Sequence, residues 1–417
     1  MTRTNLWTCL GATVLAAAAA RPAAAQTIAI TGGTVLPGTG PKIERGTVVI
    51  TNGRITAVGA NVAVPPGAKV IDASGKWVTP GLIHADASAG AGIRGLGGQG
   101  EANVSGNVTP SFNPALGLDP EAIALPIART GGITTGVIIP RGSFIQGQAI
   151  GINLAGEAAG QMVALSPAAL AINLTDDAKA AGGGARAGTI ALLDRLFADA
   201  LDYDARRLSY RRGAMQDLAA PPAELDALLP ALRGRLPVII TANRRIDIEN
   251  ALLLAQKHKL KLILRGAIEG WKVADAIAKA GVPVIMEPNT DIPSFDGLGA
   301  RLDNVTLLRQ AGVKVVIAQG DPGGERNLRF AAGNAVRNGV SWDDALKAIT
   351  VWPAEAFGMT NYGSLAVGKI GNVVVWSGDP FEFSTGAEHV IIRGQETSLR
   401  TRENELRDRY RNLPPPR

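Results

Sequence analysis

Polar side chains that follow a short apolar run are the strongest candidates for chemistry in this sequence. The run at residues 80–83 is followed at alternate positions by His84, Asp86 and Ser88. Alternate residues of a strand share a face, so the imidazole and the carboxylate can act together. With Asp321, which ends a later apolar run, they offer one nitrogen and two carboxylates to a divalent metal. A hydrogen-bonded polar cluster without metal is the alternative, and we favour it.

Asp86 and Asp321 are also the candidate catalytic groups, because a carboxylate can serve as a general base. A metal lowers the pKa of bound water from about 15.7 to about 7, whereas a general base supplies roughly 10²–10⁴-fold in rate. A carboxylate alone is therefore expected to suffice only for an activated ester, lactone or imine. The sequence has no Gly-x-Ser-x-Gly elbow in a strand-turn-helix context, so a serine nucleophile is not expected.

Three further polar residues stand at the ends of predicted strands and are candidates for substrate binding: Arg265, Asn243 and Glu287. The planar guanidinium of Arg265 can hold a carboxylate, although an ion pair with Glu269 or Glu287 is the use that we predict first. Glu287 is a candidate acid or base, and a structural ion pair is an equally good interpretation of it.

Apolar strands alternate with helical stretches through the middle of the chain, which is typical of a parallel α/β fold. The predicted strands are residues 133–140, 237–243, 261–266, 283–288 and 314–321, and the predicted helices are 189–200, 223–232, 247–257, 272–280 and 343–350. A (β/α)₈ TIM barrel closes such an alternation, and its functional residues gather at the carboxyl ends of the strands. A doubly wound sheet would give a similar alternation.

The two ends of the chain have a different pattern, with short strands separated by turns. We predict a small discontinuous β-sandwich from residues 26–79 and 360–400, a TIM-barrel domain at 80–359, and a C-terminal helix and tail at 401–417. Residues 87–120 are rich in Gly, Ser, Asn and Pro. We expect them either to form a lid over the barrel mouth or to lack fixed structure.

The first 25 residues read as a signal peptide, with Arg3, an apolar run and Ala23-Ala24-Ala25 before Gln26. We therefore expect an exported, periplasmic protein with no membrane span after cleavage. The one cysteine, Cys9, lies inside this segment, so the mature chain would have no disulfides. The formal net charge is +6, but the basic residues are dispersed, which argues against a nucleic-acid partner.

Several separate segments resemble the imidazolonepropionase-like members of the amidohydrolase superfamily. In chain order they are Ile30-Thr31-Gly32-Gly33-Thr34-Val35, Asn52-Gly53-Arg54-Ile55, Val70-Ile71-Asp72-Ala73-Ser74-Gly75-Lys76, Pro80-Gly81-Leu82-Ile83, Trp352-Pro353-Ala354-Glu355-Ala356-Phe357-Gly358 and Gly363-Ser364-Leu365-Ala366-Val367-Gly368-Lys369. The resemblance implies a TIM barrel with a β-sandwich and the hydrolysis of C–N bonds in cyclic amides or peptide-like substrates. The one cofactor that it implies is a divalent metal, zinc.

The resemblance breaks down at the metal ligands. Where the family has histidines at strand ends, this chain has Asp86, Ser88, Thr241 or Asn243, and Gly266, whereas Asp321 matches the family's strand-eight aspartate. The other two histidines of the mature chain, His258 and His389, are predicted to be structural, with His258 at a solvated helix end.

The sequence is consistent with three functions. The first is a degenerate family member that binds a small polar ligand or a partner subunit, as a homo- or hetero-oligomer. The second is an active hydrolase that uses Asp321 and Asp86 with an atypical or weakly bound metal. The third is a non-catalytic partner subunit of an active homologue.

Overall fold

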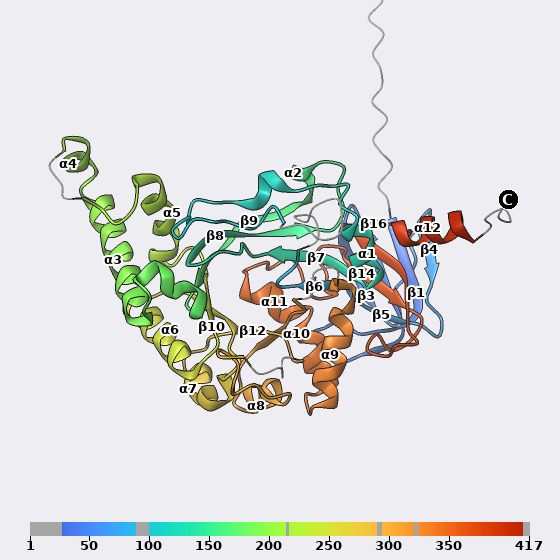
Figure 1. The fold of residues 1–417 in the computed structure, drawn as a ribbon. Helices are drawn as coiled ribbons and strands as arrows, with labels where there is room; N and C mark the ends of the chain where they lie inside the picture. The colour runs from blue at the N-terminus through green and yellow to red at the C-terminus, as the bar shows by residue number, and fades with distance from the viewer. Residues whose placement is uncertain (1–26, 89–99, 214–216, 290–293, 321–323, 412–417) are drawn as a thin grey trace, which may run out of the picture.

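Two eight-stranded sheets and the helices around one of them make up the computed structural model, which describes residues 27–88, 100–213, 217–289, 294–320 and 324–411 (Figure 1). The predicted signal peptide and Asp321 lie outside these ranges. None of the helices in the described ranges has the length and hydropathy needed to cross a bilayer.

The sheet that the helices surround is a nearly closed barrel, and its first strand begins directly after Gly81. Its strands, in spatial order, are β6 (Leu82–His84), β7 (Ile133–Ile138), β8 (Ile145–Asn153), β9 (Val163–Asn173), β10 (Val238–Ala242), β11 (Leu262–Gly266), β12 (Val284–Met286) and β13 (Val315–Ile317). Most of their residues are buried, and they form the main hydrophobic core. The mixed α/β barrel that the alternation predicts is therefore confirmed.

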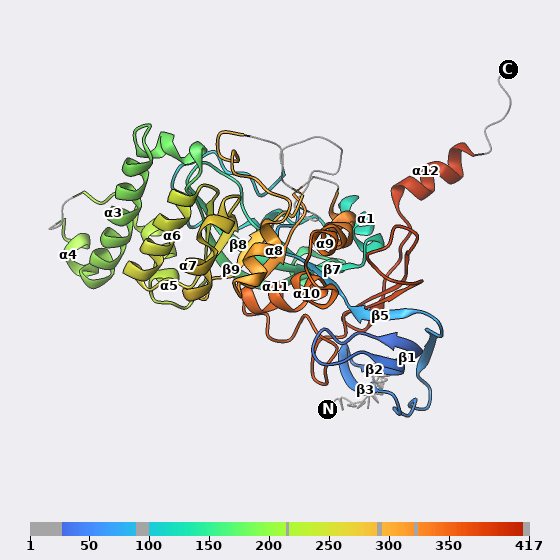
Figure 2. The ribbon, with the colours of Figure 1, turned by 90° about the horizontal axis from the view of Figure 1, so that it is seen from below.

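The helices that connect the barrel strands, and three that follow the last of them, lie around this sheet (Figures 1 and 2). They are α1 (Ala124–Thr130), α2 (Ala159–Met162), α3 (Arg186–Ala205), α4 (Arg207–Arg211), α5 (Pro222–Leu232), α6 (Arg245–His258), α7 (Ala274–Lys279), α8 (Asn304–Gln310), α9 (Leu328–Arg337), α10 (Trp342–Ala348) and α11 (Val351–Ala356). Short 3₁₀ turns lie at Pro114–Gly117, Asp176–Gly182, Gly270–Val273 and Glu325–Asn327. Each of the five predicted helices has a helix at its position.

The barrel departs from a uniform parallel alternation at β7, β8 and β9, which pair antiparallel. None of the predicted strands covers residues 145–153, but β8 begins at Ile145 and is almost wholly buried. Gly147 is the reason that this strand was not predicted. Its φ is +115°, and a side chain there would meet the carbonyl oxygen of Phe112 at 2.7 Å. A glycine is required at this close approach, and it interrupts the apolar pattern that marks a strand.

Part of the long segment predicted as a lid or a disordered loop packs against β8. After residues 87 and 88, the described part resumes at residue 100. Its backbone bonds to the loop before β8 through Val104 N–H to Arg141 O (2.9 Å) and to β8 itself through Thr109 N–H to Ile145 O (3.0 Å). These bonds fix residues 100–112 along the barrel wall. The remainder, residues 89–99, lies outside the described ranges.

The second sheet is built from both ends of the chain and lies to one side of the helices (Figure 2). Its strands are β1 (Thr27–Val35), β2 (Ile43–Thr51), β3 (Arg54–Gly59), β4 (Lys69–Asp72), β5 (Trp77–Pro80), β14 (Val373–Trp376), β15 (Ala387–Ile392) and β16 (Gln395–Glu396). Antiparallel pairing of β5 with β14 joins the two ends. Beyond the sheet, α12 (Arg402–Tyr410) projects from the body of the molecule, at the position predicted for a C-terminal helix.

His84 spans the opening between the first and last barrel strands. Its Nε2 lies 3.0 Å from the carbonyl oxygen of Gln319, two residues beyond β13, and its Nδ1 accepts the Asp86 N–H at 3.2 Å. The Gln319 N–H also points at Nε2, but at 3.3 Å it is farther than the carbonyl oxygen. Because Nδ1 accepts from Asp86, the proton is assigned to Nε2, which donates to the Gln319 carbonyl oxygen. The side chain is fully buried, and burial holds the pKa of His84 below its ordinary value of 6.5 against the opposing charges of Glu325 and Asp86.

The buried imidazole makes stability sensitive to mild acid. Below about pH 6.5 the unfolded chain protonates His84 while the folded chain resists protonation, so stability falls as pH falls. We expect the melting temperature to drop from pH 7 to pH 5, and His84→Gln to have a shallower drop. His389→Gln, in the other sheet, is the control. An unchanged slope in His84→Gln would contradict this assignment.

Candidate functional site

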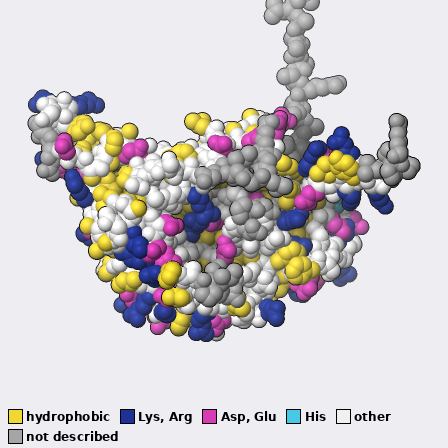
Figure 3. Space-filling view, viewed as in Figure 1, with side chains coloured by type: hydrophobic (Ala, Val, Ile, Leu, Met, Phe, Trp, Pro, Cys, Tyr) yellow, Lys and Arg dark blue, Asp and Glu magenta, His cyan; other side chains and the backbone are white. Residues whose placement is uncertain are grey.

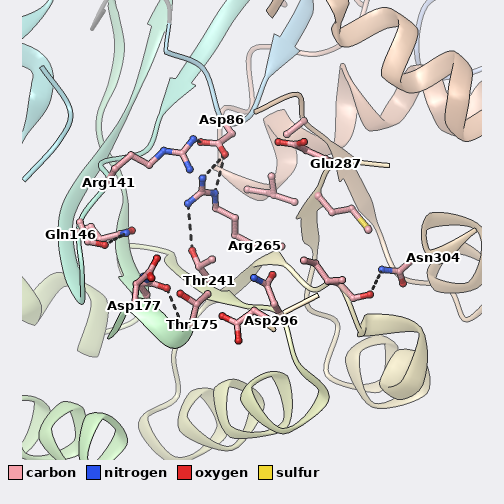
Figure 4. Close-up of a pocket in the computed structure, with 18 of the residues that line it drawn as sticks. Asp86, Arg141, Gln146, Thr175, Asp177, Thr241, Arg265, Glu287, Asp296 and Asn304 are labelled. Carbon is pink, nitrogen blue, oxygen red and sulfur yellow. Dashed lines mark hydrogen bonds and ion pairs between the residues drawn. The ribbon is translucent and has the colours of Figure 1, made fainter. Parts of the chain in front are cut away.

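A cavity of about 530 Å³ opens at the carboxyl ends of the barrel strands. Its walls include residues that end or follow strands β6, β7, β10, β11, β12 and β13: Asp86, Arg141, Thr241, Asn243, Arg265, Gly266, Glu287 and Ala318 (Figure 4). This is the end of the barrel at which enzymes of this architecture place their sites. On the same side of the molecule, acidic and basic side chains are intermixed (Figure 3).

Asp86 is held by two arginines at the centre of this cavity (Figure 4). Arg265 donates to its Oδ2 through Nε (2.9 Å) and Nη2 (2.6 Å), and Arg141 donates to its Oδ1 through Nη2 (2.9 Å). The side chains of Asp86 and Arg265 are 8% and 11% exposed, whereas that of Arg141 is 44% exposed. Two guanidinium groups against one carboxylate leave one positive charge in excess at this point.

Strand register explains how Arg265 reaches this position. Thr241 of β10 is the register partner of Arg265 in the parallel neighbour β11, so both side chains point to the same side of the sheet. The Thr241 hydroxyl lies 3.5 Å from Arg265 Nη1. The predicted ion pair with Glu269 is wrong, because Glu269 pairs with Lys272 at 2.6 Å while Arg265 pairs with Asp86.

Neither Arg141 nor Glu325 was among the residues predicted to form the site. Arg141 lies in the loop that follows β7, and its place directly after a predicted barrel strand is the signal that could have identified it. Glu325 is 3% exposed and accepts hydrogen bonds from the Ser88 N–H (2.6 Å) and hydroxyl (2.7 Å). No pattern near Glu325 indicated this contact, which spans 237 residues.

The described residues do not fit the metal centre that the fold family implies. Both ring nitrogens of His84 are directed at backbone groups, and both carboxylate oxygens of Asp86 carry guanidinium groups. Within the described ranges, no group of three or more His, Cys, Asp or Glu side chains is arranged to hold a metal. A zinc hydrolase needs about three protein ligands and an open position.

Gly266 could not accept a ligand histidine without rearrangement. Its φ is +86°, and a side chain there would meet Asn243 Oδ1 at 2.2 Å. The side chain of Asn243 thus lies beside the position where the family carries a histidine. Asn243 lines the cavity, and so does Glu287, whose Oε1 lies close to Gly320.

The two remaining histidines contact carboxylates away from the cavity. His258 Nε2 lies 2.7 Å from Asp194 Oδ1, and its ring packs edge-on against Phe197. With a side chain only 12% exposed, it is not the solvated helix end that its charged neighbours suggested. His389 Nδ1 lies 2.6 Å from Glu396 in the second sheet.

Comparisons with known proteins agree with this architecture. Residues 272–397 match the family model described as "Amidohydrolase family". The amidohydrolase tasK of Hapsidospora irregularis is 23% identical over 394 residues, which cover 84% of this chain but 39% of that protein. A dihydroorotase of Pelotomaculum thermopropionicum is 52% identical over 54 residues, 13% of this chain and 12% of that enzyme. The chain thus spans about two fifths of the first relative and a smaller share of the second.

Solved structures give the same result over nearly the full chain. An amidohydrolase from Thermotoga maritima has a TM-score of 0.82 at 26% identity, covering 89% of this chain and all of that one. Molinate hydrolase has a TM-score of 0.55 at 21% identity, covering 90% and 95%, and shares the fold. The chain is a member of the amidohydrolase superfamily. Its closer similarity to imidazolonepropionase-like members stays a prediction.

The two arginines should contribute unequally to stability. Arg265→Met removes two hydrogen bonds from a buried carboxylate, and breaking a buried pair costs about 3–5 kcal/mol. Arg141→Met affects a half-exposed pair, for which the loss is about 1 kcal/mol or less. Urea unfolding of both variants tests this. Equal, small losses would contradict the central role of Arg265.

Proposed function

We propose that this protein is a non-metal member of its superfamily that binds a small ligand bearing a carboxylate at the barrel mouth, with weak or no hydrolytic activity. The observation that carries the proposal is the pairing of the Asp86 carboxylate with two guanidinium groups. The two guanidinium groups neutralise the Asp86 carboxylate and occupy three of its roughly four acceptor positions, which makes it a weak base and a poor metal ligand.

The part of the Arg141 guanidinium that does not face Asp86 supports a carboxylate as the ligand. Only Nη2 of this guanidinium contacts Asp86, and its Nε and Nη1 donate to no described residue. Arginine matches a carboxylate through two parallel N–H groups. Ile268, Ile285 and Met286 add apolar wall to the cavity, which suits a short aliphatic or aromatic group beside the acid. Export to the periplasm, inferred from residues 1–25, remains part of this proposal.

Metal content separates this proposal from the hydrolase alternative. We expect elemental analysis of protein purified without chelator to give zinc, and any other divalent metal, well below one ion per chain. The alternative expects one metal per chain and turnover of an activated ester or lactone, which Asp321→Asn would abolish without lowering the melting temperature. That result would overturn the proposal.

Ligand charge tests the proposed binding mode. N-acetyl amino acids should bind at least about tenfold more tightly than their C-terminal amides, because a hydrogen bond to a charged group is worth about 1.5–3 kcal/mol. Titration calorimetry measures the difference, and Arg141→Gln should remove it. Arg301→Gln is the control, since Arg301 lines the same cavity but is paired with Asp303. Equal binding of acids and amides would refute carboxylate recognition.

A further inference from the structure

A second and larger hollow lies at the opposite, amino-terminal ends of the barrel strands. Its free volume is about 1390 Å³, and it is bounded by the residues that lead into β10, β11, β12 and β13 together with α6, α7 and α11. We call it the basal groove. It shares no lining residue with the cavity at the mouth.

The walls of the basal groove are largely apolar. They include Leu236, Leu253, Leu260, Val282, Trp352 and Phe357. Leu253 is 62% exposed although it lies on α6, a helix packed against the barrel. Phe357, in contrast, is 2% exposed. Small-molecule pockets usually measure about 300–1,000 Å³, so the groove has room for an extended chain.

The charges around the groove are unbalanced. Arg235, Lys261 and Lys279 are exposed in its lining, and their side chains bond to no described residue. The two acids in the lining are already paired, Glu249 with Arg245 (2.8 Å) and Glu355 with Lys314 (2.8 Å). The charge left without a partner is therefore positive, and it borders an apolar wall.

We propose that the basal groove binds a free long-chain carboxylate. The methylene chain would lie along the leucine and aromatic walls, where each buried methylene is favourable. The head group would lie among the three unpaired cations, whose long side chains can place their charge at the edge of apolar surface. A quaternary ammonium of equal chain length matches the walls but is repelled by the cations.

Titration calorimetry with octanoate, decanoate and dodecanoate, each below its micelle concentration, tests this inference. The titrations use Arg141→Gln protein, in which the mouth no longer recognises a carboxylate. In that protein we expect one site per chain and an affinity that rises by up to about fourfold per added methylene. Dodecyltrimethylammonium should bind far more weakly. The double variant Lys261→Glu/Lys279→Glu should lose at least tenfold in dodecanoate affinity, as expected when attraction by two cations becomes repulsion.

Arg212→Glu is the matched control, because Arg212 is exposed, is bonded by its side chain to no described residue and lies outside the groove. It should bind dodecanoate as the parent does. An unchanged affinity in the double variant, or equal binding of the ammonium, would overturn the inference. So would binding to phosphatidylglycerol vesicles without binding of monomeric dodecanoate, or a dimer in light scattering that Leu253→Glu dissociates. None of these outcomes depends on ligand binding at the mouth.

Discussion

The ion pairs between Asp86 and its two arginines are the constraint on which the rest of the site depends. A buried carboxylate is costly unless its charge is matched and its oxygens accept hydrogen bonds. Arg265 meets both needs from β11 and Arg141 from the loop after β7, so one acid ties three parts of the barrel mouth together. The cations that neutralise this acid belong to the chain itself.

The backbone near this ion pair also leaves no room for a ligand side chain at Gly266. Gly266 adopts a conformation that favours glycine, and Asn243 occupies the space that a side chain there would need. His84 uses both ring nitrogens to join β6 to the end of β13. A single substitution would therefore not create a metal centre here, because the positions around Asp86 already make other packing contacts and hydrogen bonds.

The two ends of the barrel present different chemistry. At the carboxyl ends of the strands, charged groups are largely paired and the walls are mixed, which suits a small polar ligand. At the amino ends, apolar walls meet cations that bond to no described residue, which suits an amphiphile. Both surfaces are built on the same strands, because the residues just before and just after a buried strand are the first that reach solvent.

The sequence by itself determined the alternation of buried strands and amphipathic helices and the strand-rich character of both chain ends, because burial patterns are local. The alternation fits a doubly wound sheet as well as a barrel, and the pairing of the strands decided for the barrel. The sequence also determined that histidines are missing at the expected strand ends. Only the tertiary structure decided what replaced them. Asp86 meets Arg141 across 55 residues and Arg265 across 179. No local pattern encodes such a pair: strand register and the closing of the barrel decide which side chains meet.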